Sequence, residues 1–257
     1  MAGPSLAAQG YLLSQALLPA PTANQVPVGQ RGSVYGDTFG LSLIPTKHVL
    51  ASEGSYFVVT NPTPGSAVAY GSAGTQTSFS DTVPFMIFQN LNTINSGVLM
   101  YLDYLKLIQI GGTAPATTTS VQLAVKIDSA LRSPTSGTTT SPISPINPNM
   151  NAAGGNGRLI VPTGAVAAIP VPSSAARVAG RAQLKGGPTL LLDEYSVQFG
   201  PGDTTPQGGY LTTVSSYMTR VPPVILGPQQ SAVVHLWFPG GATNPFTYEY
   251  EAAWWER

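Results

Sequence analysis

The sequence contains no cysteine among its 257 residues. Disulfide frameworks, zinc–thiolate sites and thiol nucleophiles are therefore excluded. Charged residues make up only 9% of the chain, against about 25% in an ordinary soluble domain, and 11 basic residues cancel 11 acidic ones. Without net charge no global field can steer nucleic acid or a membrane surface, so we expect neither as a partner. No apolar run approaches the roughly 20 residues that span a bilayer.

Glycine and proline are abundant instead, with 28 and 24 residues. Both residues are unfavourable inside helices, so this content favours short elements joined by many turns. The low charge has a second consequence, because a globular monomer normally keeps its surface charged for solubility. We therefore expect copies of the chain and a larger scaffold to cover much of its surface.

The C-terminal stretch, residues 230–257, carries the clearest structural pattern. Residues 231–238 are apolar on both faces, as in a strand that is covered on both sides. Residues 246–257 alternate with period two, which is typical of a strand with one buried face. The Pro/Gly-rich residues between them predict a loop. We expect the last strand to complete a β-sandwich, with Trp254 and Trp255 packed either under it or against a partner.

Short strand-like runs separated by turn residues fill most of residues 37–257. The longest run, residues 97–110, is also long enough for a helix, but its tyrosines, isoleucines and flanking glycines favour a strand. Residues 120–131 are expected to pair with it. About a dozen short strands without βα alternation predict an all-β fold, an antiparallel β-sandwich of the jelly-roll type. The other predicted strands are residues 39–44, 55–60, 66–71, 83–89, 159–161, 175–185, 189–199, 209–220 and 223–226.

Residues 1–36 predict an extended N-terminal arm that lies over a neighbouring subunit. A short helix is possible over residues 5–18, because Ser5 suits an N-cap and Pro19 would end it. A secretion signal is the alternative, but the first basic residue is Arg31, so the positive region of such signals is missing. The candidate interface residues are Leu6, Tyr11, Leu13 and Leu17 in this arm, together with Trp254 and Trp255.

Residues 133–157 form a long Ser/Thr/Pro-rich insertion with few apolar residues. Loops beyond roughly 12–15 residues are usually functional or disordered. We expect this insertion to lie on another subunit.

The carboxylates show no catalytic spacing. Asp193 and Glu194 are adjacent, so they should point to opposite faces of a strand. Glu249 and Glu251 share a face, but no nucleophile or sugar site stands at a fixed spacing from them. No Gly-rich phosphate loop opens a helix, and no cluster has metal-ligand spacing. We therefore expect a protein that is not an enzyme and has no catalytic residue, cofactor or metal site.

The basic residues favour structural roles as well. His48 and His235 are far apart in the sequence, and His235 falls within a strand, where a packed core or interface histidine is expected. A basic stripe is formed by Arg177, Arg181, Gln183 and Lys185, which alternate with small and apolar residues and therefore share one strand face. A nucleic-acid surface would need more cations interleaved with aromatic residues. We interpret this stripe as a solvated or inter-subunit face.

Four segments resemble bacteriophage head proteins of the cement, or decoration, type. They are residues 58–71 (VVTNPTPGSAVAYG), 83–90 (VPFMIFQN), 101–105 (YLDYL) and 223–257. The resemblance implies a jelly-roll protein that sits on an icosahedral shell, often as a trimer at three-fold positions. It also implies an N-terminal arm that staples neighbouring capsid subunits. It supplies no catalytic residue.

The expected function is that of a structural virion protein on the capsid surface. It would bind the outside of a phage capsid and stabilise it by bridging capsid subunits, with the major capsid protein and itself, as a homotrimer, for partners. The alternatives are another virion component (a major capsid or tail protein), a carbohydrate-binding receptor spike that stacks sugars on its Trp and Tyr residues, and a glycoside hydrolase.

Overall fold

The computed structural model divides into two compact units, Met1–Thr46 and Lys47–Arg257, which we describe separately. The structure describes residues 11–13, 27–29, 46–61, 63, 65, 68–69, 84–111, 120–132, 137–139, 143–166, 177–186, 190–200, 216–238 and 246–257.

In the first unit, strands β1 (Tyr11–Leu13) and β2 (Pro27–Gly29) form an antiparallel pair. The helix predicted over residues 5–18 is therefore wrong at residues 11–13, which are extended. A helix of this length is marginal in isolation, whereas tyrosine and pairing with β2 favour a strand. The rest of the predicted helix lies outside the described residues.

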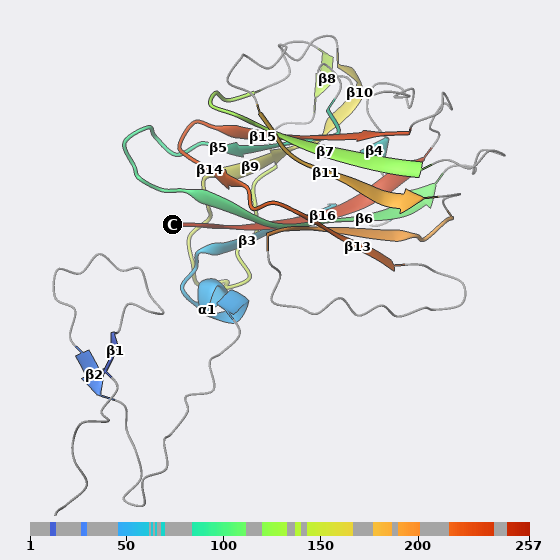
Figure 1. Ribbon diagram of the computed structural model, residues 1–257. Coiled ribbons are helices and arrows are strands. Elements are labelled where there is room, and N and C mark those ends of the chain that lie inside the picture. Colours follow the sequence, from blue (N-terminus) through green and yellow to red (C-terminus); the bar gives the residue numbers. More distant parts are fainter. Residues whose placement is uncertain are drawn as a thin grey trace, which may run out of the picture. The chain divides into compact units, whose positions relative to one another are not determined.

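The second unit is built almost entirely of strands (Figure 1). Its elements are α1 (Thr46–Ser52), β3 (Tyr56–Thr60), β4 (Val68–Ala69), β5 (Met86–Asn90), β6 (Met100–Gly111), β7 (Ser120–Asp128), β8 (Gly137–Thr139), β9 (Gly157–Ile160), β10 (Pro162–Val166), β11 (Arg177–Gly186), β12 (Glu194–Phe199), β13 (Ser216–Val221), β14 (Ile225–Leu226), β15 (Ser231–Trp237) and β16 (Thr247–Glu256). Most predicted strands have a counterpart here, β8 and β10 were not predicted, and the strand expected at residues 39–44 lies outside the described residues.

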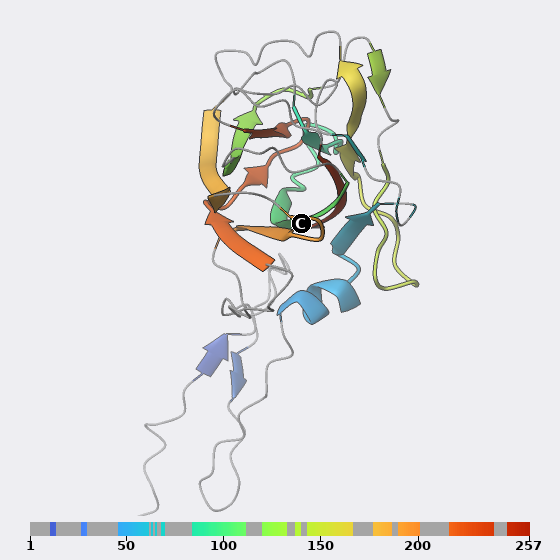
Figure 2. The same ribbon diagram turned by 90° about the vertical axis from the view of Figure 1, so that its right-hand side faces the viewer.

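Two sheets pack as a sandwich, which confirms the predicted fold class. One sheet has the order β11-β7-β15-β5-β9 and the other the order β13-β12-β6-β16-β3, with β14 paired to β6 and β4 to β16. The described pairs are antiparallel except β12 and β13, which run parallel. Figure 1 shows the sheets as two layers, and Figure 2 views them along the strands. The jelly-roll topology stays a prediction.

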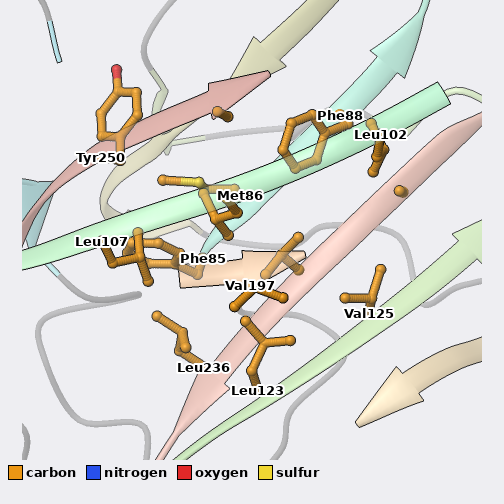
Figure 3. Packing of buried hydrophobic residues seen from close by; sticks show 14 of the residues in the cluster. Phe85, Met86, Phe88, Leu102, Leu107, Leu123, Val125, Val197, Leu236 and Tyr250 are labelled. Carbon is orange, nitrogen blue, oxygen red and sulfur yellow. The ribbon is translucent and has the colours of Figure 1, made fainter. Parts of the chain in front are cut away.

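The hydrophobic core lies between the two sheets, as the packing in Figure 3 illustrates. The alternation predicted for the last strand is confirmed, since the side chains of Tyr248, Tyr250 and Trp254 are buried, whereas those of Glu249 and Glu251 are half-buried on the opposite face. Strand β15 is buried on both faces, as expected for the middle strand of a covered sheet. Each large buried side chain contributes roughly 1.5–3 kcal/mol.

Strand β7 does not pair with β6, so that expectation is wrong. It lies in the other sheet, between β11 and β15, while β6 is flanked by β12 and β16. Both strands have a period-two pattern, and that pattern specifies which face of a strand is buried but not which strand lies beside it.

The insertion at residues 133–157 packs on its own sandwich over residues 143–157, contrary to the prediction that it lies on another subunit. Ile143 forms a bridge to Leu159 in β9, and Ile146 forms one to Val58 in β3. These strands are the edges of the two sheets on the same side of the sandwich. The insertion therefore pairs with one position on each edge, where unpaired backbone groups would otherwise be open to other chains.

Candidate interaction surfaces

The outer face of the seven-stranded sheet carries a polar network beside α1. Tyr56 donates a hydrogen bond of 2.6 Å to Asp103 Oδ2, and Lys47 Nζ lies 2.8 Å from the same oxygen. The Tyr104 hydroxyl donates a hydrogen bond to Glu251 Oε1, and the Lys47 ammonium lies over the Tyr104 ring. Burial raises the pKa of both tyrosines, and their bonds to carboxylates raise it further. Both phenols therefore stay protonated donors at neutral pH, and their carboxylate partners are already engaged.

A small hollow of about 130 Å³ adjoins this network. It contains Glu249 and Glu251 on one face, as predicted, with Lys106 beside them. Each of these groups is already occupied: Glu251 by Tyr104, Glu249 by the N–H of Gly65, and Lys106 by Glu194 at 3.3 Å. The charged groups of this hollow are therefore committed to contacts within the chain.

A larger open hollow of about 400 Å³ lies at the end of the sandwich where the chain terminates. Its walls come from residues 53–55, Phe57, Asn92, Val98 and residues 152–156, together with Glu256. Glu256 Oε1 accepts hydrogen bonds from Gly157 N at 2.7 Å and Trp254 Nε1 at 3.1 Å, and Oε2 accepts one from Asn156 N at 3.0 Å. A Cβ atom at Gly157 would lie 2.5 Å from Trp254 Nε1, so this position requires glycine. We call this feature the C-terminal hollow.

We expect Glu256→Gln to lower the free energy of unfolding by about 1–3 kcal/mol, because an amide cannot accept all three bonds and turns a donor towards backbone N–H groups. The measurement is urea denaturation followed by tryptophan fluorescence. The matched control is Arg257→Gln, which removes an exposed ion pair with Glu53 and should cost at most about 1 kcal/mol. Equal losses in the two variants would contradict this role of Glu256.

An asparagine-rich turn at residues 147–151 immediately precedes residues 152–156, which line the C-terminal hollow. Asn147 Oδ1 accepts a bond from Asn149 N, and Asn149 Oδ1 accepts one from Asn151 N, so two side-chain turns follow each other. The side-chain amides of Asn147 and Asn149 donate to the carbonyls of Gly54 and Ser52 at the end of α1. This fixed turn holds Met150 97% exposed, and Ile94 in the turn at residues 93–96 is 75% exposed.

The two tryptophans of the predicted interface have different environments. Trp254 is fully buried in the core of its own chain, with its ring edge-on to Phe88 at 6.0 Å between centroids. It therefore cannot serve as the interface residue that the sequence predicted. Trp255 lies half-buried on the outer sheet face and stacks on Tyr101, with centroids 5.4 Å apart.

The arm residues of the predicted interface remain untested. Leu6 and Leu17 lie outside the described residues, and Tyr11 and Leu13 are in β1, where only the backbone is described.

The basic stripe is interrupted by a β-bulge. Arg181 and Gln183 are exposed, but the register of β11 shifts between Gln183 and Lys185, and Lys185 is buried. The stripe is therefore wrong at Lys185. His235 is fully buried in β15, which confirms its expected packed position, whereas His48 is exposed on α1.

Sequence reasoning missed the contacts that build the C-terminal hollow. The run at residues 147–151, Asn-Pro-Asn-Met-Asn, is typical of side-chain turns and could have indicated a fixed turn. No local pattern indicates the partners of Glu256, because they lie about 100 positions away.

Within the described parts of the chain, no group of three or more His, Cys, Asp or Glu residues is placed to hold a metal ion. The same parts contain no helix with the length and apolarity that crossing a membrane requires. Comparison of the chain with models of protein families, with curated protein sequences and with solved structures gives no match. The likeness to phage decoration proteins therefore stays a resemblance of the quoted segments, and no family is assigned.

Proposed function

We propose that this protein is a structural virion protein that binds the outside of a phage capsid and stabilises it by bridging capsid subunits. One observation carries the proposal: every carboxylate side chain in the described part of the chain has a partner within that chain. The pairs are Glu53 with Arg257, Asp103 with Lys47, Asp128 with Arg132, Asp193 with Lys185, Glu194 with Lys106, Glu249 with Gly65, Glu251 with Tyr104 and Glu256 with Gly157.

Carboxylates that are paired in this way stabilise the fold of their own chain. Contacts with other proteins must then be made mainly by apolar side chains and backbone groups. Exposed apolar side chains such as Ile94, Met150 and Ile225 are available for such contacts. A surface of this kind suits many weak contacts with uncharged neighbours, as in an assembled shell.

The N-terminal unit supports the same proposal. A two-stranded pair such as β1 and β2 is marginally stable on its own, because it cannot bury a core. It gains stability if another surface covers it, and a capsid subunit would supply that surface. When contacts are repeated by symmetry, each contact that forms raises the effective concentration for the next, so the assembly is stable even if each single contact is weak. The partners would be the major capsid protein and further copies of this chain as a trimer.

A carbohydrate-binding role is the second candidate, and the half-buried Tyr101–Trp255 pair on the outer sheet face favours it. Aromatic rings on a sheet surface can contact the apolar faces of sugars. Glycan-array binding that Trp255→Ala abolishes would support this role over the capsid role.

Deletion of residues 1–36 tests the capsid role. We expect the sandwich to keep its stability to urea, while attachment to empty capsids assembled from the phage's major capsid protein weakens by about tenfold or more, since avidity is lost. Co-sedimentation with the capsids measures attachment.

A full-length variant with Leu6, Leu13 and Leu17 replaced by serine is the matched control for chain length, and it should weaken attachment similarly. Unchanged attachment after the deletion would remove the arm from the proposal. Failure of the intact chain to attach at all would overturn the proposed function.

A further inference from the structure

Three consecutive leucines are exposed at the end of the sandwich opposite the C-terminal hollow. Leu190, Leu191 and Leu192 are 50%, 55% and 54% exposed. They precede β12 by one residue, Asp193, and lie beside the end of β6, where Leu192 N donates a bond of 2.7 Å to Gln109 O. We call residues 190–192 the leucine turn. Apolar side chains that are exposed as a group often mark interaction sites, whereas single exposed apolar side chains are common on any protein surface.

The leucine turn is held in one conformation by buried contacts. Leu192 has a φ of +67°, which is unfavourable for a residue with a branched side chain. Asp193 accepts a bond of 2.7 Å from Leu190 N through Oδ2, and Lys185 Nζ lies 2.6 Å from the same oxygen. Asp193 is fully buried, and the Lys185 ammonium lies over the Tyr217 ring. An unfavourable backbone conformation persists only where the surrounding contacts fix it. Here these contacts hold the turn so that the three leucine side chains stay exposed.

The C-terminal hollow has the properties of a complementary surface. Its volume of about 400 Å³ is bounded in part by small and apolar residues, namely Phe57, Val98, Ala152, Ala153 and Gly154. The hollow contains two carboxylates, and both already have partners: Glu256 accepts hydrogen bonds from backbone N–H groups, and Glu53 is paired with Arg257. An apolar side chain that enters the hollow therefore does not leave either carboxylate without a partner.

The two surfaces lie at opposite ends of one strand. The hollow includes Val98, just before β6, and the leucine turn lies beside Gln109, near the end of β6. Figure 1 shows β6 running from the end that contains the C-terminus to the other end of the sandwich. A strand of 12 residues spans roughly 40 Å, so the leucine turn cannot reach the hollow of its own chain.

We propose that copies of this protein associate head to tail, with the leucine turn of one copy seated in the C-terminal hollow of the next. An apolar projection and a hollow at separate places on one molecule produce a heterologous contact, which closes into a ring or continues as an open chain. This contact extends the proposed function, because it specifies how copies of the protein associate. It rests on that function only in assuming that several copies lie together.

Disulfide trapping tests the contact cleanly, because the chain contains no cysteine. Purified Leu191→Cys and Ala153→Cys proteins are mixed under mild oxidation and analysed by non-reducing electrophoresis. Both positions are exposed, so the variants should fold. We expect the mixture to form a cross-linked heterodimer that neither protein forms alone. The control is Met218→Cys, exposed on β13, which should not cross-link with either.

A second measurement uses no cysteine. Leu190→Ser/Leu191→Ser, which removes the apolar side chains of the turn, and Ala153→Asp, which places a charge in the hollow, should each weaken self-association by about tenfold or more in sedimentation velocity, because the apolar contact is lost. Circular dichroism confirms that each variant is folded.

Cross-linking of Leu191→Cys with itself would show a symmetric contact between leucine turns and overturn the head-to-tail arrangement, as would the absence of any cross-link. Head-to-tail cross-linking without capsid attachment would leave this inference standing and refute the capsid function. Capsid attachment without cross-linking would refute this inference and leave the capsid function standing.

Discussion

Replacing Lys185 with methionine is expected to lower the free energy of unfolding by about 3–5 kcal/mol, because it leaves the Asp193 carboxylate buried without its cation. Lys185 and Asp193 are 9% and 0% exposed, and their charged atoms lie 2.6 Å apart. Solvent cannot reach the remaining charge, and the hydrogen bonds from Leu190 N and the Tyr195 hydroxyl replace only part of the lost ion pair. Guanidinium denaturation, monitored by circular dichroism, measures the change.

The double variant Lys185→Met/Asp193→Asn should recover most of that stability. Both charges are then absent, and the asparagine oxygen still accepts the bond from Leu190 N. The matched control is Lys106→Gln, which removes the half-exposed pair with Glu194 and should cost about 1 kcal/mol or less. A single variant as stable as the parent, or a double variant less stable than the single, would contradict the role assigned to this pair.

Replacing Trp254 with alanine is expected to cost about 3–5 kcal/mol, since it removes the largest class of side chain from a fully buried site and leaves a cavity between the sheets. Its indole also donates to Glu256, which loses one of its bonds. The midpoint of urea unfolding should fall, and the soluble yield should decrease.

Trp255→Ala provides the comparison one residue away. Trp255 is half-buried and stacked on Tyr101, so we expect a loss of about 1 kcal/mol. Similar losses for both tryptophans would contradict the assignment of Trp254 to the core. So would a Trp254→Ala protein that is as stable as the parent but no longer self-associates, because Trp254 would then be an interface residue.

The sequence predicted the strands well where alternation was complete. In β16 the residue pattern alone placed Tyr248 and Tyr250 in the core and Glu249 and Glu251 outside. Alternation failed at β-bulges, where one extra residue reverses the faces of those that follow. This is why Lys185 is buried although its pattern matched the exposed Arg181.

Strand partners and long-range polar contacts could not be predicted. The choice between β6 and β15 as a neighbour of β7 depends on how the loops cross between sheets, which no local period records. The insertion looked like an external loop because it has few apolar residues, yet backbone hydrogen bonds at Ile143 and Ile146 connect it to both sheet edges. The leucine turn went unnoticed because the three leucines fell within the strand predicted at residues 189–199, whereas β12 begins only at Glu194.

The molar mass of the intact, isolated chain tests the central claim most directly, and sedimentation equilibrium over a wide concentration range measures it. We expect a mass that is a multiple of one chain, because a surface so poor in charge is covered by identical copies. A mass of one chain at every concentration, in a sample that stays soluble, would contradict the account.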